Sequence, residues 1–328
     1  MSQIDLLDTF INALHCRINK KSDLVNFIAD SLNIEKESVY RRLNKKVYFS
    51  VTEVGLLSAK LGISIDRILN YKYKYGYASP PAYTLYLPKR VQSIDSLIDS
   101  IEINLKLLED ISKESTEFGQ TFLSLPIEFV IRHNNLLKFI YFKWGYYYTG
   151  SKDYDNFSLW QIPERLLSIN NKITEIYRRW KSITYLWDMS SIWCLVKDIE
   201  YFNSIHALNP NDTEALKCDL HKMLYNMEQV AAGISINYFD SDRIQIYIST
   251  VQMGGELAYY ISNEKQYSSF HTYFIGSKFS DDRQTCMQVH DWIDSMKKVC
   301  TLISNSGAKE RTLFFNEQHQ IVDNILMK

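Results

Sequence analysis

Residues 22–69 read SDLVNFIADSLNIEKESVYRRLNKKVYFSVTEVGLLSAKLGISIDRIL, and their apolar side chains recur at helical spacing. A first helix of this stretch is predicted from four apolar residues that share one face: Leu24, Val25, Ile28 and Leu32. Ser22 is suited to cap its start, and Asn33 is suited to end it because Asn enters the left-handed backbone region at low cost. A third short helix of the chain is predicted from about Glu35 to Asn44.

Further short helices are predicted on both sides of this pair. One begins at Ser50 or Thr52 and ends at Gly62, another spans about 64–69, and one over about 4–14 precedes them all. Five short helices in under seventy residues predict a compact all-α domain.

Positive charge is concentrated at the N-terminus. Residues 1–75, where we place this domain, hold 12 Lys and Arg against 8 Asp and Glu, whereas the remainder holds 25 against 30. The net charge of -1 for the whole chain hides this asymmetry. A basic domain at one end of a neutral chain is typical of a nucleic-acid-binding module.

The stretch 22–69 resembles the lambda-repressor-like (XRE-type) helix-turn-helix family of DNA-binding domains. The resemblance rests on Ala29 and Leu32, on Ile34 after the turn, and on the blocks SVYRRLNKK at 38–46 and LGISIDRIL at 61–69. It implies a helix that enters the major groove of DNA. Within that helix it assigns base reading to four positions: Lys36, Glu37, Tyr40 and Arg41.

The chemistry of these residues fits that role. Val39 and Leu43 are spaced to anchor the helix on the core, which leaves its other face free. Arg41 can donate two hydrogen bonds to guanine, and Glu37 can accept one from cytosine. Contacts to phosphates, which add affinity without sequence information, are expected from a second group: Ser38, Arg42, Lys45 and Lys46.

Three positions depart from the family pattern, and two alternatives stay open. Val25 replaces a Gln that contacts the DNA backbone, Asn33 replaces the usual Gly of the turn, and Lys45 replaces the Gly after the third helix. In one alternative the turn lies at 59–64 and the recognition helix at 65–72. In the other, the whole domain docks a partner protein instead of DNA.

A Tyr-rich segment with three prolines, KYGYASPPAYTLYLP at 74–88, predicts an interdomain linker, which we place at 76–88. The second domain then spans 89–328. It begins with a heptad-like seam of apolar residues: Val91, Ile94, Ile98, Ile101, Leu105 and Leu108. The seam predicts either a helix packed within a bundle or a short zipper between two copies of the chain.

The fold class expected for the whole chain is mainly α. After the N-terminal domain we expect a larger helical domain that ends in an α+β portion with a small antiparallel sheet. Its helices are predicted near 126–147, 163–185, 188–207, 211–231, 281–303 and 309–326. Its strands are predicted at 243–251, 256–262 and 270–275.

Motifs for catalysis or metal binding are weak. Cys218 with His221, and Cys286 with His290, each share a helical face and together offer four zinc ligands, but buried structural residues are the simpler interpretation. No phosphate-binding Gly-rich loop or nucleophile elbow occurs, so we expect no enzymatic activity, metal or cofactor. Five scattered cysteines and the absence of a long apolar segment indicate a cytoplasmic protein without a membrane partner.

The function predicted from the sequence is a DNA-binding transcription regulator with double-stranded DNA as its partner. The layout is similar to that of bacterial regulators with an uncharacterised C-terminal part. A single helix-turn-helix domain buries too little surface against DNA for tight binding, so we expect a homodimer. The heptad seam is its candidate interface. The many Tyr and Phe residues after Tyr71 raise the further hypothesis of a pocket for a small-molecule or peptide effector.

Overall fold

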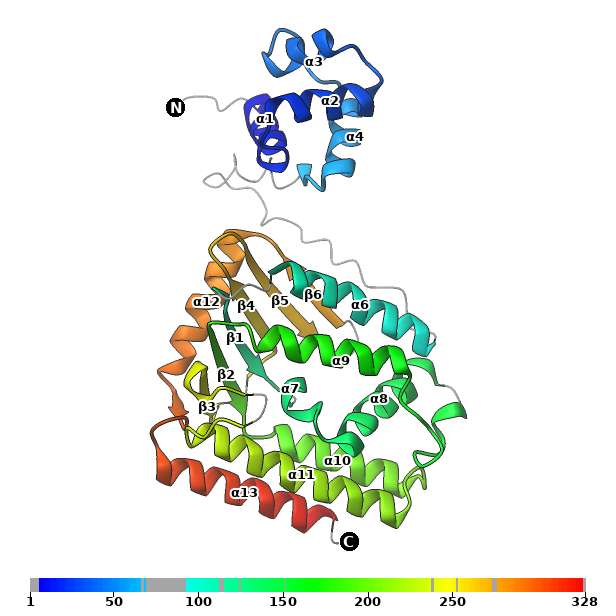
Figure 1. The fold of residues 1–328 in the computed structure, drawn as a ribbon, viewed down its shortest axis with the longest axis vertical. Helices are drawn as coiled ribbons and strands as arrows, with labels where there is room; N and C mark the ends of the chain where they lie inside the picture. The colour runs from blue at the N-terminus through cyan, green and yellow to red at the C-terminus, as the bar shows by residue number, and fades with distance from the viewer. Residues whose placement is uncertain are drawn as a thin grey trace. The chain divides into compact units, whose positions relative to one another are not determined.

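In its computed structural model the chain forms two units, Met1–Tyr86 and Leu87–Lys328, here called the N-terminal and the C-terminal unit (Figure 1). The structure describes residues 6–65, 68, 93–111, 115–123, 125–150, 152–236, 239–251, 253–272 and 276–326. The linker expected at 76–88, most of the helix expected over 64–69, most of the alternative recognition helix at 65–72 and Val91 lie outside these residues.

Four helices of the N-terminal unit are described: α1 (Leu6–Arg17), α2 (Lys21–Leu32), α3 (Lys36–Leu43) and α4 (Val51–Leu61). The ends predicted at Asn33 and Gly62 are confirmed, but the cap predicted at Ser22 is wrong, because α2 begins at Lys21 and Ser22 lies within its first turn. Asn33 ends α2 in the left-handed conformation at φ 51°, and Gly62 ends α4 at φ 62°. Ser50 caps α4, because its hydroxyl accepts from the backbone N–H of Glu53 while the Glu53 carboxylate accepts from the N–H of Ser50.

The core of the N-terminal unit draws on each of its four helices and on the segment between α3 and α4. Its buried residues include Leu14, Leu24, Ile28, Val39 and Leu57. Phe10 and Phe49 meet edge to face inside it, with ring centroids 5.6 Å apart. This core fixes the orientation of α2 and α3, the two helices of the predicted helix-turn-helix.

The C-terminal unit alternates helices and strands. Its α-helices are α6 (Ile94–Ile111), α7 (Ile127–Val130), α8 (Asn134–Thr149), α9 (Glu164–Tyr177), α10 (Ser191–Ser204), α11 (Pro210–Ala231), α12 (Arg283–Lys297) and α13 (Ala308–Leu326). Its strands are β1 (Glu117–Phe122), β2 (Ser182–Asp188), β3 (Ile244–Ser249), β4 (Glu256–Ile261), β5 (Gln266–Thr272), β6 (Gly276–Ser280) and β7 (Cys300–Leu302).

These strands form one mixed sheet of seven strands in the order β6-β5-β4-β1-β2-β3-β7. The pairs β1 with β2 and β2 with β3 are parallel, and all other pairs are antiparallel. The expectation of a mainly α fold with a small antiparallel sheet is therefore wrong. The sheet is the centre of the unit, and its three parallel strands are connected by helices, as parallel strands require.

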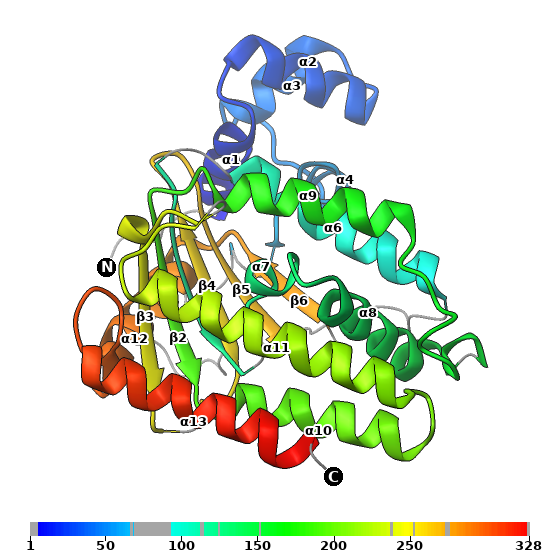
Figure 2. The same cartoon turned by 60° about the horizontal axis from the view of Figure 1, so that its bottom comes forward.

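Helices cover the two faces of the sheet unequally (Figures 1 and 2). One face packs on α12, and a small cluster including Leu186, Tyr259, Cys286 and Ile293 fills that contact. The other face carries the remaining helices, with α13 packed outside α10 and α11. The large core lies on this second face.

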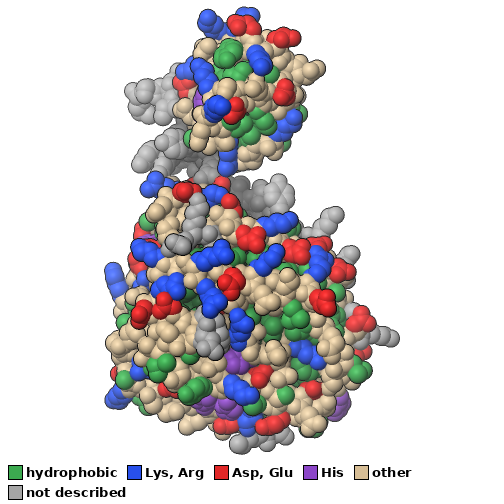
Figure 3. All heavy atoms as spheres, in the orientation of Figure 1, with side chains coloured by type: hydrophobic (Ala, Val, Ile, Leu, Met, Phe, Trp, Pro, Cys, Tyr) green, Lys and Arg blue, Asp and Glu red, His purple; other side chains and the backbone are tan. Residues whose placement is uncertain are grey.

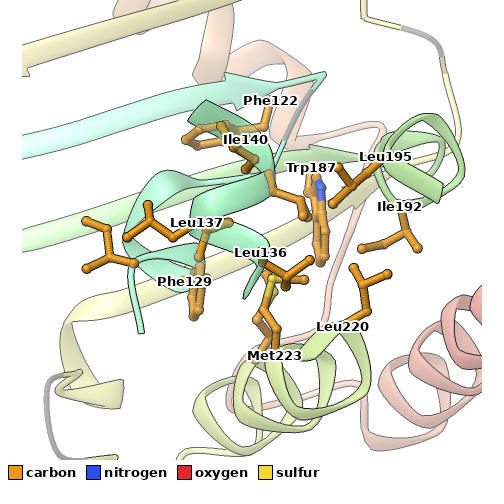
Figure 4. Close-up of a cluster of buried hydrophobic side chains, with 14 of the residues drawn as sticks. Phe122, Phe129, Leu136, Leu137, Ile140, Trp187, Ile192, Leu195, Leu220 and Met223 are labelled. Atoms are coloured by element: carbon orange, nitrogen blue, oxygen red, sulfur yellow. The ribbon is translucent and has the colours of Figure 1, made fainter. Parts of the chain in front are cut away.

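The main core holds both aromatic and aliphatic side chains where the helices meet the sheet. Figure 4 shows Trp187 of β2 beside Ile192 and Leu195 of α10, with Leu220 and Met223 of α11 below it. All five side chains are buried. The burial of this many large side chains is the principal term that stabilises the C-terminal unit.

The sequence patterns failed at the two central strands for a physical reason. The helix expected over 163–185 includes Ser182–Tyr185 at the start of β2, but in the structure α9 stops at Tyr177. In β2, Tyr185 and Trp187 face the main core while Leu186 faces α12, so both faces are apolar and the alternation of a strand is lost. Strand β1 has only six residues and contains Gly119, which is atypical of strands.

Two other expected helices differ from the structure, one in its length and one in its continuity. The helix expected over 281–303 ends at Lys297, and β7 follows it at the edge of the sheet. The helix expected over 126–147 is split into α7 and α8 at residues 131–133. Strand β6 was also missed, and it extends the hairpin of β4 and β5.

The heptad seam belongs to the interior of the C-terminal unit. Ile98 and Leu105 are buried in the main core, and Ile94, Ile101 and Leu108 pack against it as α6 contacts α9. The seam is thus the buried face of a helix within the domain. It is not available as a zipper between two copies, which corrects the candidate dimer interface.

Candidate nucleic-acid interface

Helix α3 is fixed to the N-terminal unit by the two aliphatic residues expected to anchor it. Val39 is 0 % exposed and Leu43 is 9 % exposed, and both lie in the core that α2 and α4 share. These two residues are four apart, so they lie on one side of the helix. The other side of α3 is turned away from the core.

A tight turn at Asn33 and Ile34 joins α2 to α3. Asn33 lies in the left-handed region, and its backbone N–H donates to the carbonyl of Ala29. The N–H of Ile34 donates to the same carbonyl at 3.1 Å. Ala29 is buried, so its small side chain lets the neighbouring helices approach closely.

The exposed side of α3 carries all four residues predicted to read bases: Lys36, Glu37, Tyr40 and Arg41. Their positions follow the helical repeat, because 36 and 40 are one turn apart and so are 37 and 41. The structure therefore brings these four side chains to one exposed surface, here called the α3 face.

The residues predicted to contact phosphates are in more varied surroundings. Lys46 is exposed, and Ser38 is half-buried with its carbonyl accepting from Nη1 of Arg42 at 3.3 Å. Lys45 forms an ion pair with Asp8 of α1, although both side chains stay largely accessible. Of this group, only Lys46 has a charged side chain for which no ion pair is seen within the described residues.

Arg42 is engaged by a residue that the sequence patterns did not single out. Its Nη2 donates to Oε1 of Glu53 at 2.8 Å and its Nε to Oε2 at 3.3 Å, with both side chains 17 % exposed. Burial alone would raise the pKa of Glu53. Hydrogen bonds from Arg42 and from the backbone of Ser50 outweigh burial, and the pKa of Glu53 is lowered overall.

The loop after α3 adopts the shape that a glycine normally supplies. Lys45 has φ 59°, in the left-handed region, at the position where the helix-turn-helix pattern that the sequence resembles has Gly. The N–H groups of Lys46 and Val47 both donate to the carbonyl of Arg41, at 2.8 and 3.2 Å. Lys45 therefore keeps the usual turn despite its side chain, at an expected local cost of about 1–2 kcal/mol.

The sequence contains one signal for the role of Glu53 at the start of α4 and none for its ion pair with Arg42. Ser50 followed three residues later by Glu53 is the pattern of a capping box, in which Glu53 returns to the start of α4. The contact with Arg42 joins residues eleven apart on different helices. Only the folded arrangement of α3 and α4 reveals it.

The two Cys-His pairs considered for zinc do not meet. Cys218 is exposed on α11, whereas Cys286 is buried on α12 at the opposite face of the sheet. His221 lies instead against His319 of α13, with their Nδ1 atoms 2.6 Å apart and their rings stacked. Throughout the described ranges, no three His, Cys, Asp or Glu side chains gather as ligands of a metal ion.

Figure 3 shows Lys and Arg side chains on the surface of both units.

Comparisons with protein-family models, with curated proteins and with solved structures found no match for the chain. No helix in the described part of the chain is both long and apolar enough to cross a bilayer.

Proposed function

We propose that the chain is a sequence-specific DNA-binding transcription regulator that uses α3 as its recognition helix. The observation that carries the proposal is that Val39 and Leu43 anchor α3 while the α3 face, Lys36, Glu37, Tyr40 and Arg41, stays exposed. An exposed helix of this composition, following a helix and a tight turn, fits the major groove of B-DNA.

Within this proposal the residues divide by role. Arg41 and Glu37 read base edges, with Lys36 and Tyr40 beside them, and Lys46, Ser38 and Lys45 bind phosphates. For Arg42 the ion pair with Glu53 favours a supporting role, because a guanidinium that holds two hydrogen bonds to a carboxylate has fewer donors left for DNA.

We propose further that two copies act together on one site. A single module of this size buries too little surface for tight specific binding, so paired half-sites about one helical turn apart are expected. Such a regulator would act in the cytoplasm, where bacterial DNA lies.

Selection of DNA from a random-sequence pool by the purified full-length protein tests the proposal. We expect enrichment of a short sequence, in two symmetric halves if the protein binds as a dimer. Recovery of a pool without any enriched sequence, at low and moderate salt, would contradict sequence-specific binding.

One observation favours a second candidate, in which the N-terminal unit docks a protein. Tyr48 and Val51, in and after the loop that follows α3, are both largely exposed, and apolar residues at such a position suit a protein partner. Substituting both with Ser distinguishes the candidates. Under the DNA proposal, binding to the selected sequence changes little, whereas the double variant would lose a protein partner.

A further inference from the structure

A cavity of about 310 Å³ lies inside the C-terminal unit, between the sheet and its helices. Its walls come from β1, β4, β5 and β6 on one side and from α6, α8, α9 and α10 on the other. Small-molecule pockets span roughly 300–1,000 Å³, so this cavity has the size of a site for a compact organic molecule.

Aliphatic side chains and aromatic rings share the apolar part of the lining, and the rings include Phe122, Tyr141, Trp144, Tyr177, Tyr260 and Phe279. Rings of this kind give a ligand a large contact area, and their faces attract cations. The lining therefore favours a mostly apolar ligand and tolerates a positive charge.

Glu128 of α7 is the polar group that distinguishes this cavity. It lines the cavity and is 4 % exposed. The hydroxyl of Tyr185 donates to its Oε1, but its Oε2 has no hydrogen-bond partner among the described residues. A buried carboxyl oxygen without a partner is unfavourable, so a donor placed in the cavity would be bound there.

The environment of Glu128 suits a cationic ligand. Burial raises the pKa of Glu128 to about 7, because no positive group in the described chain pairs with it. Burial, with a smaller contribution from Glu128, also raises the pKa values of Tyr177 and Tyr260. These two hydroxyls thus stay protonated near the carboxyl group.

The other charged groups of the cavity already have partners. Lys143 donates to Asp198 at 2.7 Å, and Nε2 of His271 lies 4.0 Å from Oε2 of Glu256. Three carboxylates of the lining thus face one lysine, and the carboxylate that lacks a basic neighbour is Glu128. The balance of charge in the cavity is negative.

We propose that this cavity binds a small, largely apolar amine, with the protonated nitrogen donating to Oε2 of Glu128 and lying among the surrounding aromatic rings. The body of the ligand would fill the space between α6, α8 and the sheet. Binding itself does not depend on DNA recognition. Only the role of such an amine as an effector rests on the proposed function.

Titration of the purified full-length protein with simple amines, without DNA, tests this proposal. The probes are cyclohexylamine and 2-phenylethylamine, each compared with the alcohol that replaces the amino group by a hydroxyl. Trp144 lines the cavity, so Trp fluorescence reports occupancy, with calorimetry as a second readout. We expect at least one amine to bind about tenfold or more tightly than its alcohol.

Variants assign the preference to Glu128. Glu128→Gln keeps the shape and an acceptor for Tyr185, and we expect it to abolish the preference for amine over alcohol. Glu109→Gln makes the same change at an exposed position of α6, outside the lining, and should leave the preference intact. Ala258→Leu fills the cavity from β4, so it should weaken amine and alcohol alike even if Glu128→Gln folds poorly.

Three results would overturn the proposal. They are the absence of binding by every amine, equal binding of amines and alcohols, and an unchanged preference in a folded Glu128→Gln protein. Each leaves DNA binding by the N-terminal unit untouched, so failure here is distinguishable from failure of the proposed function.

Discussion

The guanidinium of Arg42 on α3 and the carboxylate of Glu53 on α4 form a two-point ion pair, with Nη2 2.8 Å from Oε1. Glu53 also completes the capping box at the start of α4. One carboxylate thus links the end of α3 to the start of α4. This ion pair fixes α3, the predicted recognition helix, to α4. It also gives Arg42 a different environment from its neighbour Arg41, which is exposed.

Arg42→Met is expected to destabilise the N-terminal unit by about 1–3 kcal/mol, because it leaves a part-buried carboxylate without its main partner. Amide hydrogen exchange measured by mass spectrometry on peptides from residues 6–65 reports this unit separately. The matched control, Arg41→Met, removes an exposed arginine on the same helix and should leave exchange unchanged. Equal protection in both variants would show that the ion pair contributes no stability.

Lys45→Gly should increase the stability of the N-terminal unit by up to about 1 kcal/mol. The native φ of 59° is strained for Lys and natural for Gly, although Gly also gains freedom in the unfolded chain. Asp8→Asn removes the partner of Lys45 without altering the backbone and serves as the control. Both variants lose the ion pair, so faster exchange in Lys45→Gly than in Asp8→Asn would mean that the freedom gained by Gly in the unfolded chain outweighs the relief of backbone strain.

Gly119→Ala should destabilise the C-terminal unit by about 1–3 kcal/mol through overpacking of the sheet. A Cβ at Gly119 would lie 2.3 Å from Cε1 of Tyr259, whose ring is buried under α12. Gly254→Ala, where an added Cβ meets nothing within 4 Å, is the control. All six Trp residues lie in this unit, so urea unfolding followed by Trp fluorescence measures it alone.

Glu128 should make the stability of the C-terminal unit depend on pH. Its pKa is about 7 in the folded protein and near 4.5 when exposed, so the folded state binds more protons between these values. The free energy of unfolding therefore falls as the pH rises from about 4.5 to 7, and then levels off. Tyr185, Tyr177 and Tyr260, which face the carboxyl group, have raised pKa values and do not titrate in this range.

Glu128→Gln cannot ionise, so it should lose this slope and gain stability relative to the natural protein between pH 5 and pH 8. The expected gain is on the order of 1–3 kcal/mol. Urea unfolding by Trp fluorescence at pH 5, 6, 7 and 8 gives both profiles. Parallel profiles would show that burial does not raise the pKa of Glu128.

The sequence predicted the N-terminal unit better than the C-terminal one because its signals are local. Asn33, Ser50 and Gly62 mark helix ends through their own backbone and capping preferences, and all three act as expected. Strand β2 carries no such mark. Its apolar run forms a strand that is packed on both faces by helices far away in the chain, and no local signal in the sequence predicts this packing.

In the candidate site, too, the sequence predicted what local spacing determines and missed what long-range contacts determine. Helical spacing alone placed Arg41 on the exposed side and Val39 on the buried side of α3. The partners of Arg42 and Lys45, and the isolation of Glu128 in its cavity, depend on residues brought together by the fold. Such contacts cannot be read from spacing.

The central claim is that the α3 face reads bases, and one comparison tests it most directly. The affinity of the natural protein, Arg41→Ala and Lys46→Ala is measured on the selected DNA and on versions with single base changes, at several salt concentrations. Lys172→Ala, on exposed α9, is the control for loss of a positive charge. We predict that Arg41→Ala loses about 1–3 kcal/mol of binding free energy on the selected sequence and no longer distinguishes the bases at one position. Lys46→Ala should instead weaken binding to all sequences and lower the salt dependence of binding. If Arg41→Ala binds every sequence as the natural protein does, with the same salt dependence, the account of α3 as a recognition helix is contradicted.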